Sequence, residues 1–268
     1  MDDAQIQISA AKADQFREAG YFAFQGAIAP EQLQALQQES DGLLGALDEE
    51  MEQSGGTAGV NRGDRRYFVG GPHRQSPIMS AFAFGELMAR ICRALLGDSA
   101  FLWRDLLVAK RDEGTPRLAW HQESGYVAGD HAPFVNCLCV LDDIDRKSGA
   151  FYLLPLDRAA ELGRVDHLSE SEVGYAGDET GVRLDMPAGS VAVFSSMVFH
   201  RVGANTTGNL RRTYLLQYSA APLPGAGGDE INGYALPFLV DGERQAPPPL
   251  DQPVAAESED DPDEDKEA

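Results

Sequence analysis

A histidine and a glutamate, His121 and Glu123, lie two positions apart within residues 120–126. In an extended segment, residues i and i+2 point to the same face, so this imidazole and this carboxylate can converge on one point. Such a pair can give a divalent metal ion two adjacent ligands, with a third supplied from elsewhere in the chain. The same triplet arises by chance in surface strands and turns, so the pair alone does not establish a metal site.

A candidate third ligand, His200, lies further along the chain. It follows a turn at residues 187–190 and a buried-strand pattern at residues 191–194, and it precedes a polar segment rich in Gly, Asn and Thr. This places His200 at a strand end, where ligands usually sit. Two histidines and one carboxylate, with coordination positions left open, form the ligand set of non-haem Fe(II) oxygenases. A histidine packed in the core is the alternative interpretation.

Two adjacent arginines, Arg211 and Arg212, open the apolar strand that follows. Neighbours on a strand face opposite sides, so only one of them can enter a barrel. An arginine inside a barrel needs an anion, because a buried guanidinium without a partner is costly. A surface arginine is the simpler interpretation of either residue taken alone.

Together these residues resemble the phytanoyl-CoA dioxygenase family. The resemblance rests on W-H-Q-[D/E]-x-x-Y at residues 120–126, on L-D-D…G-A-F-Y-L-L-P at residues 141–155, and on H-x4-N-x5-R at residues 200–211. It covers residues 16–218 and includes a Phe-x3-Gly-Tyr opening. The resemblance implies a mainly β fold with α-helices: a double-stranded β-helix (jelly-roll or cupin-like) barrel buttressed by N-terminal helices.

The family implies Fe(II), 2-oxoglutarate and O2 as the reactants beside the substrate. Hydroxylation of a small-molecule metabolite, with release of succinate and CO2, is the expected reaction. The residues that would bind iron are His121, Glu123 and His200; those that would bind 2-oxoglutarate are Arg211, Leu106, Asn136 and Leu138. Among these, Arg211 would hold the distal carboxylate, and Asn136 would be satisfied by the co-substrate or by water.

Two alternatives share these residues. A desaturase, an epimerase or a ring-forming enzyme would use the same set, and a cupin-like sensor could keep the metal ligands without turnover. Arg211 argues against the sensor, which has no need of an anion anchor. The sequence departs from the family at Glu123, which is usually Asp, at Leu138, which is typically Trp, and at residues 155–158, which replace Pro-Gly-Ser-His.

The charge composition disfavours two classes of binding partner. The net charge of −21 and the pI of about 4.5 disfavour nucleic acid and anionic membranes, which attract basic surfaces. The family resemblance implies a small-molecule substrate, and the oligomeric state is left open. The N-terminus has no signal-peptide pattern, no apolar run approaches the ~20 residues of a membrane span, and the three cysteines fit reduced thiols. A cytoplasmic protein is expected.

The chain divides into an oxygenase domain at residues 1–244 and a disordered, Pro-rich acidic tail at residues 245–268. Capping residues and periodicity predict helices at 9–19, 30–50 and 79–96, strands at 21–24, 101–110 and 134–141, a mobile loop at 53–66 and an acidic turn at 142–149.

Alternation along residues 101–110 separates two faces of that strand. One face carries Trp103, Asp105, Leu107 and Ala109, and the other carries Arg104, Leu106, Val108 and Lys110. Arg104 could meet an anionic group of the substrate, or could form an ordinary ion pair. Three loop histidines, His73, His131 and His167, are further candidates for substrate contact.

Overall fold

The structure is a computed structural model, which describes residues 7–58, 61–62, 67–111, 120–165, 177–225 and 231–250. The candidate His167 and the acidic end of the tail, residues 251–268, lie outside the described residues. The helices are α1 (Ala10–Ala19), α2 (Pro30–Gln53), α3 (Pro72–Gln75), α4 (Pro77–Ala83), α5 (Glu86–Leu95) and α6 (Leu156–Leu162), with a 3₁₀ turn at Glu123–Tyr126.

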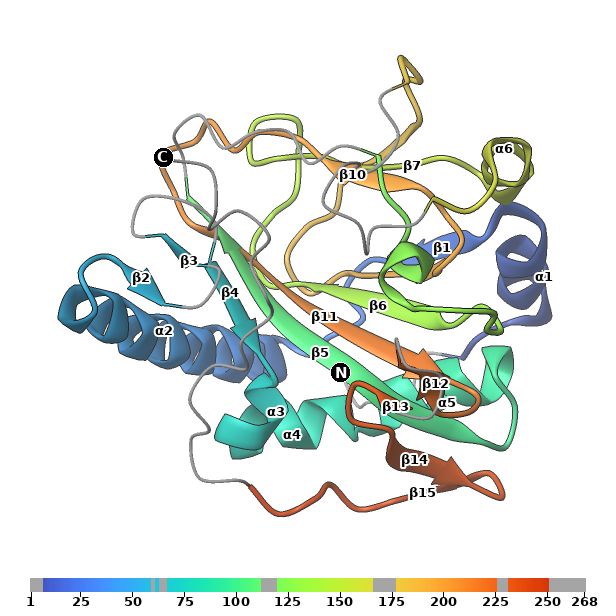
Figure 1. Ribbon diagram of the computed structural model, residues 1–268, viewed down its shortest axis with the longest axis horizontal. Coiled ribbons are helices and arrows are strands. Elements are labelled where there is room, and N and C mark those ends of the chain that lie inside the picture. Colours follow the sequence, from blue (N-terminus) through green and yellow to red (C-terminus); the bar gives the residue numbers. More distant parts are fainter. Residues whose placement is uncertain are drawn as a thin grey trace, which may run out of the picture.

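Two antiparallel sheets form the barrel (Figure 1). The main sheet has the strand order β1-β9-β6-β11-β5-β14-β15, with β4 also paired to β5, and the minor sheet has the order β10-β7-β8. The strands of the main sheet are β1 (Tyr21–Phe24), β4 (Tyr67–Gly70), β5 (Ala100–Lys110), β6 (Val135–Val140), β9 (Val191–Ser195), β11 (Arg211–Ser219), β14 (Leu236–Val240) and β15 (Glu243–Arg244). The minor sheet holds β7 (Phe151–Leu153), β8 (Val182–Leu184) and β10 (His200–Val202). Two short hairpins complete the set: β2 (Thr57–Ala58) with β3 (Asn61–Arg62), and β12 (Leu223–Pro224) with β13 (Ile231–Asn232).

The two faces of the main sheet bury different apolar clusters. On the inner face, Leu138 and Leu215 pack with Phe151 and Leu153 of the minor sheet. On the outer face, Leu216 and its neighbours pack against helices, and α2 to α5 lie on the side of the sheet opposite β7 and β10 in Figure 1. Alternating side chains therefore serve two cores, as in other packed sheets. The predicted double-stranded β-helix with N-terminal helices is confirmed.

The predicted faces of β5 are confirmed at Leu106, Leu107 and Ala109 but are wrong at Trp103. Trp103 packs with Val127 and Phe134, and Leu102 takes the place in the outer cluster, because the pairing of β5 with β11 shifts register between Gln217 and Tyr218. Leu107 and Ala109 are fully buried in the outer cluster, whereas Leu106 packs against the inner one. The register Leu215↔Leu106 and Leu215↔Leu138 places these three leucines side by side across β5, β11 and β6. Any residue two positions from them along these strands also faces the barrel interior.

Helix α1 begins and ends as the sequence predicts. The Ser9 side chain accepts a hydrogen bond from the backbone N–H of Lys12, and Gly20 ends the helix with φ 82°. A Cβ on Gly20 would lie 2.5 Å from side-chain atoms of Leu156 and of Val198, so glycine is required here both by the backbone and by space.

The single helix predicted at residues 79–96 is wrong, because α4 and α5 are separate. Helix α4 begins earlier, at Pro77, with Ser76 as its N-cap. Gly85 then breaks the helix in an extended conformation (φ −80°, ψ 167°), where a Cβ would lie 2.9 Å from the Phe82 carbonyl oxygen. The missing side chain allows this close turn, so Gly85 marks a boundary rather than a tolerated glycine inside one helix.

The segment predicted as a mobile loop at residues 53–66 is partly regular. Helix α2 runs on to Gln53, and among the described residues that follow, β2 pairs with β3. Asn61 ties β3 to β4, because its side chain donates to the Phe68 carbonyl (2.9 Å) and accepts from the Phe68 N–H (2.6 Å). The paired backbone groups of residues 57–58 and 61–62 make these parts of the segment regular.

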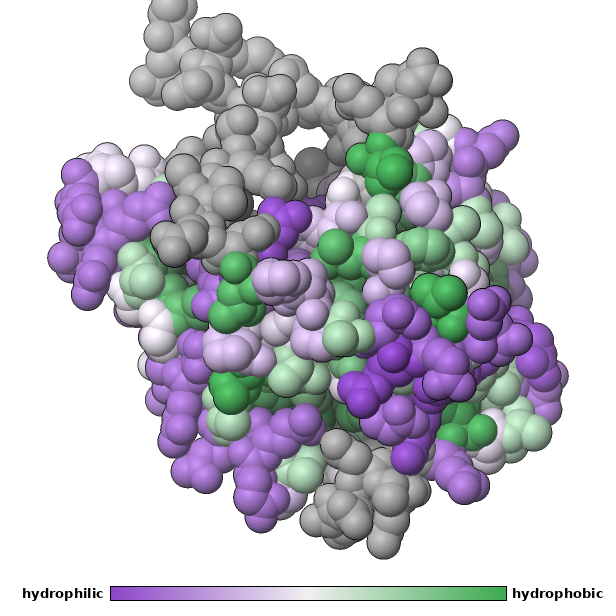
Figure 2. Space-filling model, turned by 90° about the horizontal axis from the view of Figure 1, so that it is seen from below, coloured by the Kyte–Doolittle hydropathy of each residue, from purple (hydrophilic) through white to green (hydrophobic). Residues whose placement is uncertain are grey.

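The three cysteines are reduced thiols, as the sequence predicts, and the surface mixes hydrophobic with hydrophilic residues. Cys92, Cys137 and Cys139 are buried and free, and burial raises the pKa of each thiol. Figure 2 shows hydrophobic residues in separate groups among hydrophilic ones on the face that it presents. Among the described helices, none combines the length and the apolar composition needed to cross a bilayer.

Candidate metal and co-substrate site

His121 and His200 are joined through their backbones. The His121 N–H donates to the His200 carbonyl (3.0 Å), and the His200 N–H donates to the His121 carbonyl (2.9 Å). This antiparallel bridge puts the two imidazoles side by side, with ring centroids 4.0 Å apart. His200 lies at a strand end, as predicted, and is the first residue of β10 rather than the last residue of the preceding strand.

Glu123 reaches the same point from the first position of the 3₁₀ turn. Its Oε1 atom lies 3.1 Å from His200 Nε2 and 3.7 Å from His121 Nε2. Two ligand atoms at right angles around an ion, each roughly 2.1 Å from it, lie about 3.0 Å apart. The three ligand atoms lie within 4.8 Å of one another, and all three side chains are buried, so the set can hold a metal ion.

The surroundings of Glu123 favour the ionised form of its carboxyl group. Burial works to raise the pKa of Glu123, but the hydrogen bonds and charges of His121 and His200 outweigh it and hold the pKa well below its ordinary value. A deprotonated carboxylate beside two imidazoles is the donor set of non-haem Fe(II) sites: two neutral nitrogens, one anionic oxygen and room for further ligands. Phe151 and Phe194 pack against the His200 ring, at centroid distances of 5.5 and 4.9 Å, and fix its position.

Arg211 lies on the inner face of β11, in register with Lys110 of β5. Both side chains are buried, and Lys110 Nζ donates to the Gly203 carbonyl at 2.6 Å. The sequence predicts an inward Arg211, and its position two and four residues from the inward Thr213 and Leu215 agrees with this orientation. Lys110 was missed as a site residue, although the predicted face of β5 includes it.

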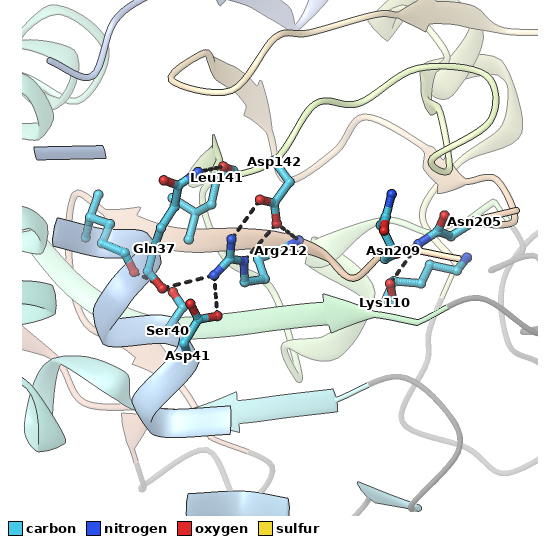
Figure 3. Close-up of polar contacts among 10 residues, drawn as sticks. Gln37, Ser40, Asp41, Lys110, Leu141, Asp142, Asn205, Asn209 and Arg212 are labelled. Atoms are coloured by element: carbon cyan, nitrogen blue, oxygen red, sulfur yellow. Dashed lines mark hydrogen bonds and ion pairs between the residues drawn. The ribbon is translucent and has the colours of Figure 1, made fainter. Parts of the chain in front are cut away.

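The motif residue Asn205 shapes the turn that leads into β11. Its Nδ2 donates to the carbonyls of Lys110 (2.9 Å) and Asn209 (2.7 Å), as Figure 3 shows, and its Oδ1 accepts from the N–H and the hydroxyl of Thr207. Asn205 is almost fully buried. It therefore fixes the ends of β5 and β11 where Lys110 and Arg211 meet.

Arg212 points to the opposite side, as predicted for a neighbour on a strand. Its Nε and Nη2 donate to the two carboxylate oxygens of Asp142, each at 2.8 Å, and its Nη1 contacts Gln37 and Asp41 of α2 (Figure 3). The Asp142 hydrogen bonds raise the pKa of Arg212 despite partial burial. Arg212 thus joins β11, the acidic turn and α2 on the helix-packed face.

Asn136 has protein partners, which corrects the expectation that co-substrate or water would satisfy it. Its Oδ1 accepts from Gln217 Nε2 at 2.8 Å, and its Nδ2 donates to the Phe194 carbonyl at 3.2 Å. The same Gln217 Nε2 donates to Glu123 Oε2 at 2.8 Å. Gln217 is not among the predicted site residues, because the partner of an inward amide depends on the register of three strands.

The other candidates for substrate contact, His73, His131 and Arg104, differ in their position relative to the three proposed metal ligands. His73 is on the outer face, where its Nδ1 lies 2.7 Å from Asp105 Oδ1 and the Tyr214 hydroxyl donates to the same carboxylate, so it is remote from the barrel interior. His131 contacts Ser124, the residue after Glu123, at 2.6 Å from Nε2 to the hydroxyl. Arg104 is the cross-strand partner of Gln217 and faces the interior.

Comparison with known proteins identifies the family. The family model described as phytanoyl-CoA dioxygenase (PhyH) matches residues 16–213. The chain belongs to the phytanoyl-CoA dioxygenase family. A curated relative, a probable alpha-ketoglutarate-dependent hypophosphite dioxygenase of Stutzerimonas stutzeri, is 28% identical over 172 residues, which are 59% of this chain and 60% of that protein. The chain therefore spans about 60% of the length of this relative.

Solved structures share the fold of this family member. The carbocyclase SnoK from nogalamycin biosynthesis has a TM-score of 0.67 at 18% identity, covering 86% of this chain and 90% of its own. EctD from S. alaskensis, in its apo form, has a TM-score of 0.67 at 22% identity, covering 93% of this chain and 90% of its own. At these identities the likeness establishes the architecture, and the chemistry depends on the residues themselves.

Proposed function

We propose that this phytanoyl-CoA dioxygenase family member is an Fe(II)- and 2-oxoglutarate-dependent dioxygenase that hydroxylates a small-molecule metabolite and releases succinate and CO2. The observation that carries the proposal is the convergence of His121, Glu123 and His200 inside a barrel whose adjoining inner face also presents Arg211. The first three residues would bind Fe(II), and Arg211 would bind the distal carboxylate of 2-oxoglutarate.

Bound Fe(II) would couple the oxidative decarboxylation of 2-oxoglutarate to oxidation of the substrate by O2. The protein's part is to hold and shield the reactants. The guanidinium of Arg211 suits a carboxylate because it can donate two parallel hydrogen bonds, and the ammonium of Lys110 adds positive charge beside it. Leu106 and Leu138, packed in the inner cluster, would line the co-substrate pocket and exclude water.

The ligands of relatives support this assignment. The epimerase SnoN has been solved with Fe3+, alpha ketoglutarate and nogalamycin RO, and EctD has been solved with 2-oxoglutarate and 5-hydroxyectoine. The curated relative is described as acting on hypophosphite, a small anion. Arg104, which faces the interior beside Gln217, would meet an anionic group of the substrate of this chain. A cytoplasmic enzyme fits the free, buried cysteines.

Residues 1–244 would form the oxygenase domain, and residues 245–268 would be a tail without a part in the chemistry. Desaturation, epimerisation and cyclisation would use the same site residues, so analysis of the oxidised product separates them from hydroxylation. A sensor that binds metal without turnover would form no succinate with any substrate.

The test combines metal binding and turnover. Wild-type protein and His200→Ala are titrated with Fe(II) without oxygen, and succinate is then measured with 2-oxoglutarate and a panel of metabolites that includes hypophosphite and uncharged compounds. We expect stoichiometric Fe(II) binding that His200→Ala abolishes, and succinate formation that one substrate class stimulates. Equal Fe(II) binding by the variant would overturn the ligand assignment.

A further inference from the structure

Three strands of the main sheet carry a chain of side-chain hydrogen bonds that ends on Glu123. Asn136 is the direct cross-strand partner of both Phe194 on β9 and Gln217 on β11. Asn136 Nδ2 donates to the Phe194 carbonyl (3.2 Å), Gln217 Nε2 donates to Asn136 Oδ1 (2.8 Å), and the same Nε2 donates to Glu123 Oε2 (2.8 Å). Asn136 and Gln217 are at most 1% exposed.

The acceptors at the two ends of this hydrogen-bond series, the Phe194 carbonyl and the Glu123 carboxylate, fix the orientation of the two side-chain amides. A backbone carbonyl can only accept, so Asn136 must turn its NH2 group to Phe194 and its oxygen to Gln217. Gln217 must then present its own NH2 group, whose second hydrogen goes to Glu123, and a carboxylate can only accept. Neither amide can flip without placing two acceptors or two donors together, so the arrangement has one orientation.

The consequence for Glu123 is that its two oxygens have different surroundings. Oε2 is held by Gln217, whereas Oε1 lies 3.1 Å from His200 Nε2 and 3.7 Å from His121 Nε2. A glutamate side chain has one more rotatable bond than aspartate and could swing to offer either oxygen or both. The hydrogen bond from Gln217 removes that freedom and leaves Oε1 facing the point where the two imidazoles converge.

We propose that Gln217 is a positioning residue, which makes Glu123 a single-oxygen metal ligand, and that Asn136 acts through Gln217. This inference rests on the proposed metal site. It also accounts for a glutamate at this position: an aspartate carboxylate would be withdrawn by one methylene and would lose the amide. Partners that orient metal-binding side chains typically change metal affinity by about 10- to 100-fold when they are removed.

The experiment measures metal affinity rather than turnover alone. Full-length protein is titrated anaerobically with Fe(II), and with Co(II) as a probe whose absorption spectrum reports coordination geometry. Gln217→Met keeps the length of the side chain but cannot donate, and we expect Kd to rise about 10- to 100-fold with a changed Co(II) spectrum. Asn136→Leu should raise Kd less, because Gln217 can still reach Glu123. The matched control is Ser219→Ala, a buried position further along β11 whose hydroxyl has no hydrogen-bond partner among the described residues.

A double-mutant cycle with Glu123→Asp separates positioning from a general effect on folding. In the Glu123→Asp background, Gln217→Met should change Kd by less than about threefold, because the shortened carboxylate no longer reaches the amide. A folding defect would weaken binding equally in both backgrounds, and that result would overturn the inference, as would unchanged Kd in Gln217→Met. Absence of metal binding by the wild-type protein would instead overturn the proposed function and this inference with it.

Discussion

Arg211 and Lys110 face each other across β11 and β5, and both side chains are buried. Two cationic side chains on neighbouring strands can both attract one carboxylate, and a guanidinium can donate two parallel hydrogen bonds to it. We therefore expect the distal carboxylate of 2-oxoglutarate to bind between these two cations, at the end of neighbouring strands.

Replacing Arg211 with Ala should raise KM for 2-oxoglutarate at least tenfold, because the loss of a bidentate charged contact costs roughly 2–4 kcal/mol, or about 30- to 1000-fold in affinity. Fe(II) binding should persist, since Arg211 is not among the three proposed metal ligands. Substrate-stimulated succinate formation at varied 2-oxoglutarate measures the first effect, and anaerobic Fe(II) titration measures the second. Loss of both together would assign Arg211 to the fold instead.

Replacing Arg212 with Ala should lower stability and leave KM for 2-oxoglutarate nearly unchanged. The paired bonds to Asp142 are largely shielded, with only 13% of the Arg212 side chain exposed, so their loss costs more than the ~1 kcal/mol of an exposed pair. We expect about 2–3 kcal/mol, which lowers Tm by roughly 5–10 °C. Thermal unfolding measures this shift. A large rise in KM with unchanged Tm would mean that the two arginines have exchanged faces.

His131 should make stability depend on pH. Burial lowers its pKa below the ordinary value of about 6.5, although the hydrogen bond to Gly129 partly opposes this. The unfolded chain therefore binds a proton at higher pH than the folded protein does, and the free energy of unfolding should fall as pH drops below about 6.5 until the folded pKa is passed. Urea unfolding between about pH 7 and pH 5 tests this. The His131→Gln variant should have a flatter profile, and parallel profiles would contradict the prediction.

Ending the chain after Gln245 should change neither Tm nor turnover appreciably. The backbone N–H of Gln245 donates to the Phe238 carbonyl and is kept in this truncation. The residues removed are Pro-rich and then strongly acidic, a composition that buries little apolar surface. Thermal unfolding and succinate formation compare the two forms, and a loss of several degrees would show that the tail packs against the domain.

Local patterns were sufficient where one strand or one cap decided the outcome. Alternation placed Leu106 and Leu107 on opposite faces of β5, and neighbouring positions separated Arg211 from Arg212. The convergence of His121, Glu123 and His200 was expected from the resemblance to the family, because the local motifs alone also fit a surface turn and a core histidine.

Other features of the structure depend on contacts that a local sequence pattern does not show. No local pattern indicates that Asn136 contacts Gln217, because that contact exists only in the register of β6 on β11. Gly85 is equally compatible with a continuous helix, and the close approach of the Phe82 carbonyl decides against it. Short strands such as β8, with three residues and two of them exposed, have no periodicity to detect.

The proposed metal ligands are held by both sheets of the barrel: the two histidines by the minor sheet and the glutamate by the main sheet. His121 is bridged to β10 in the minor sheet, whereas Glu123 is hydrogen-bonded to Gln217 in the main sheet. A metal ion bound by these three residues would therefore link the minor sheet to the main sheet. Metal loading should then slow the separation of the sheets, and the rate of unfolding would report occupancy of the site even without substrate.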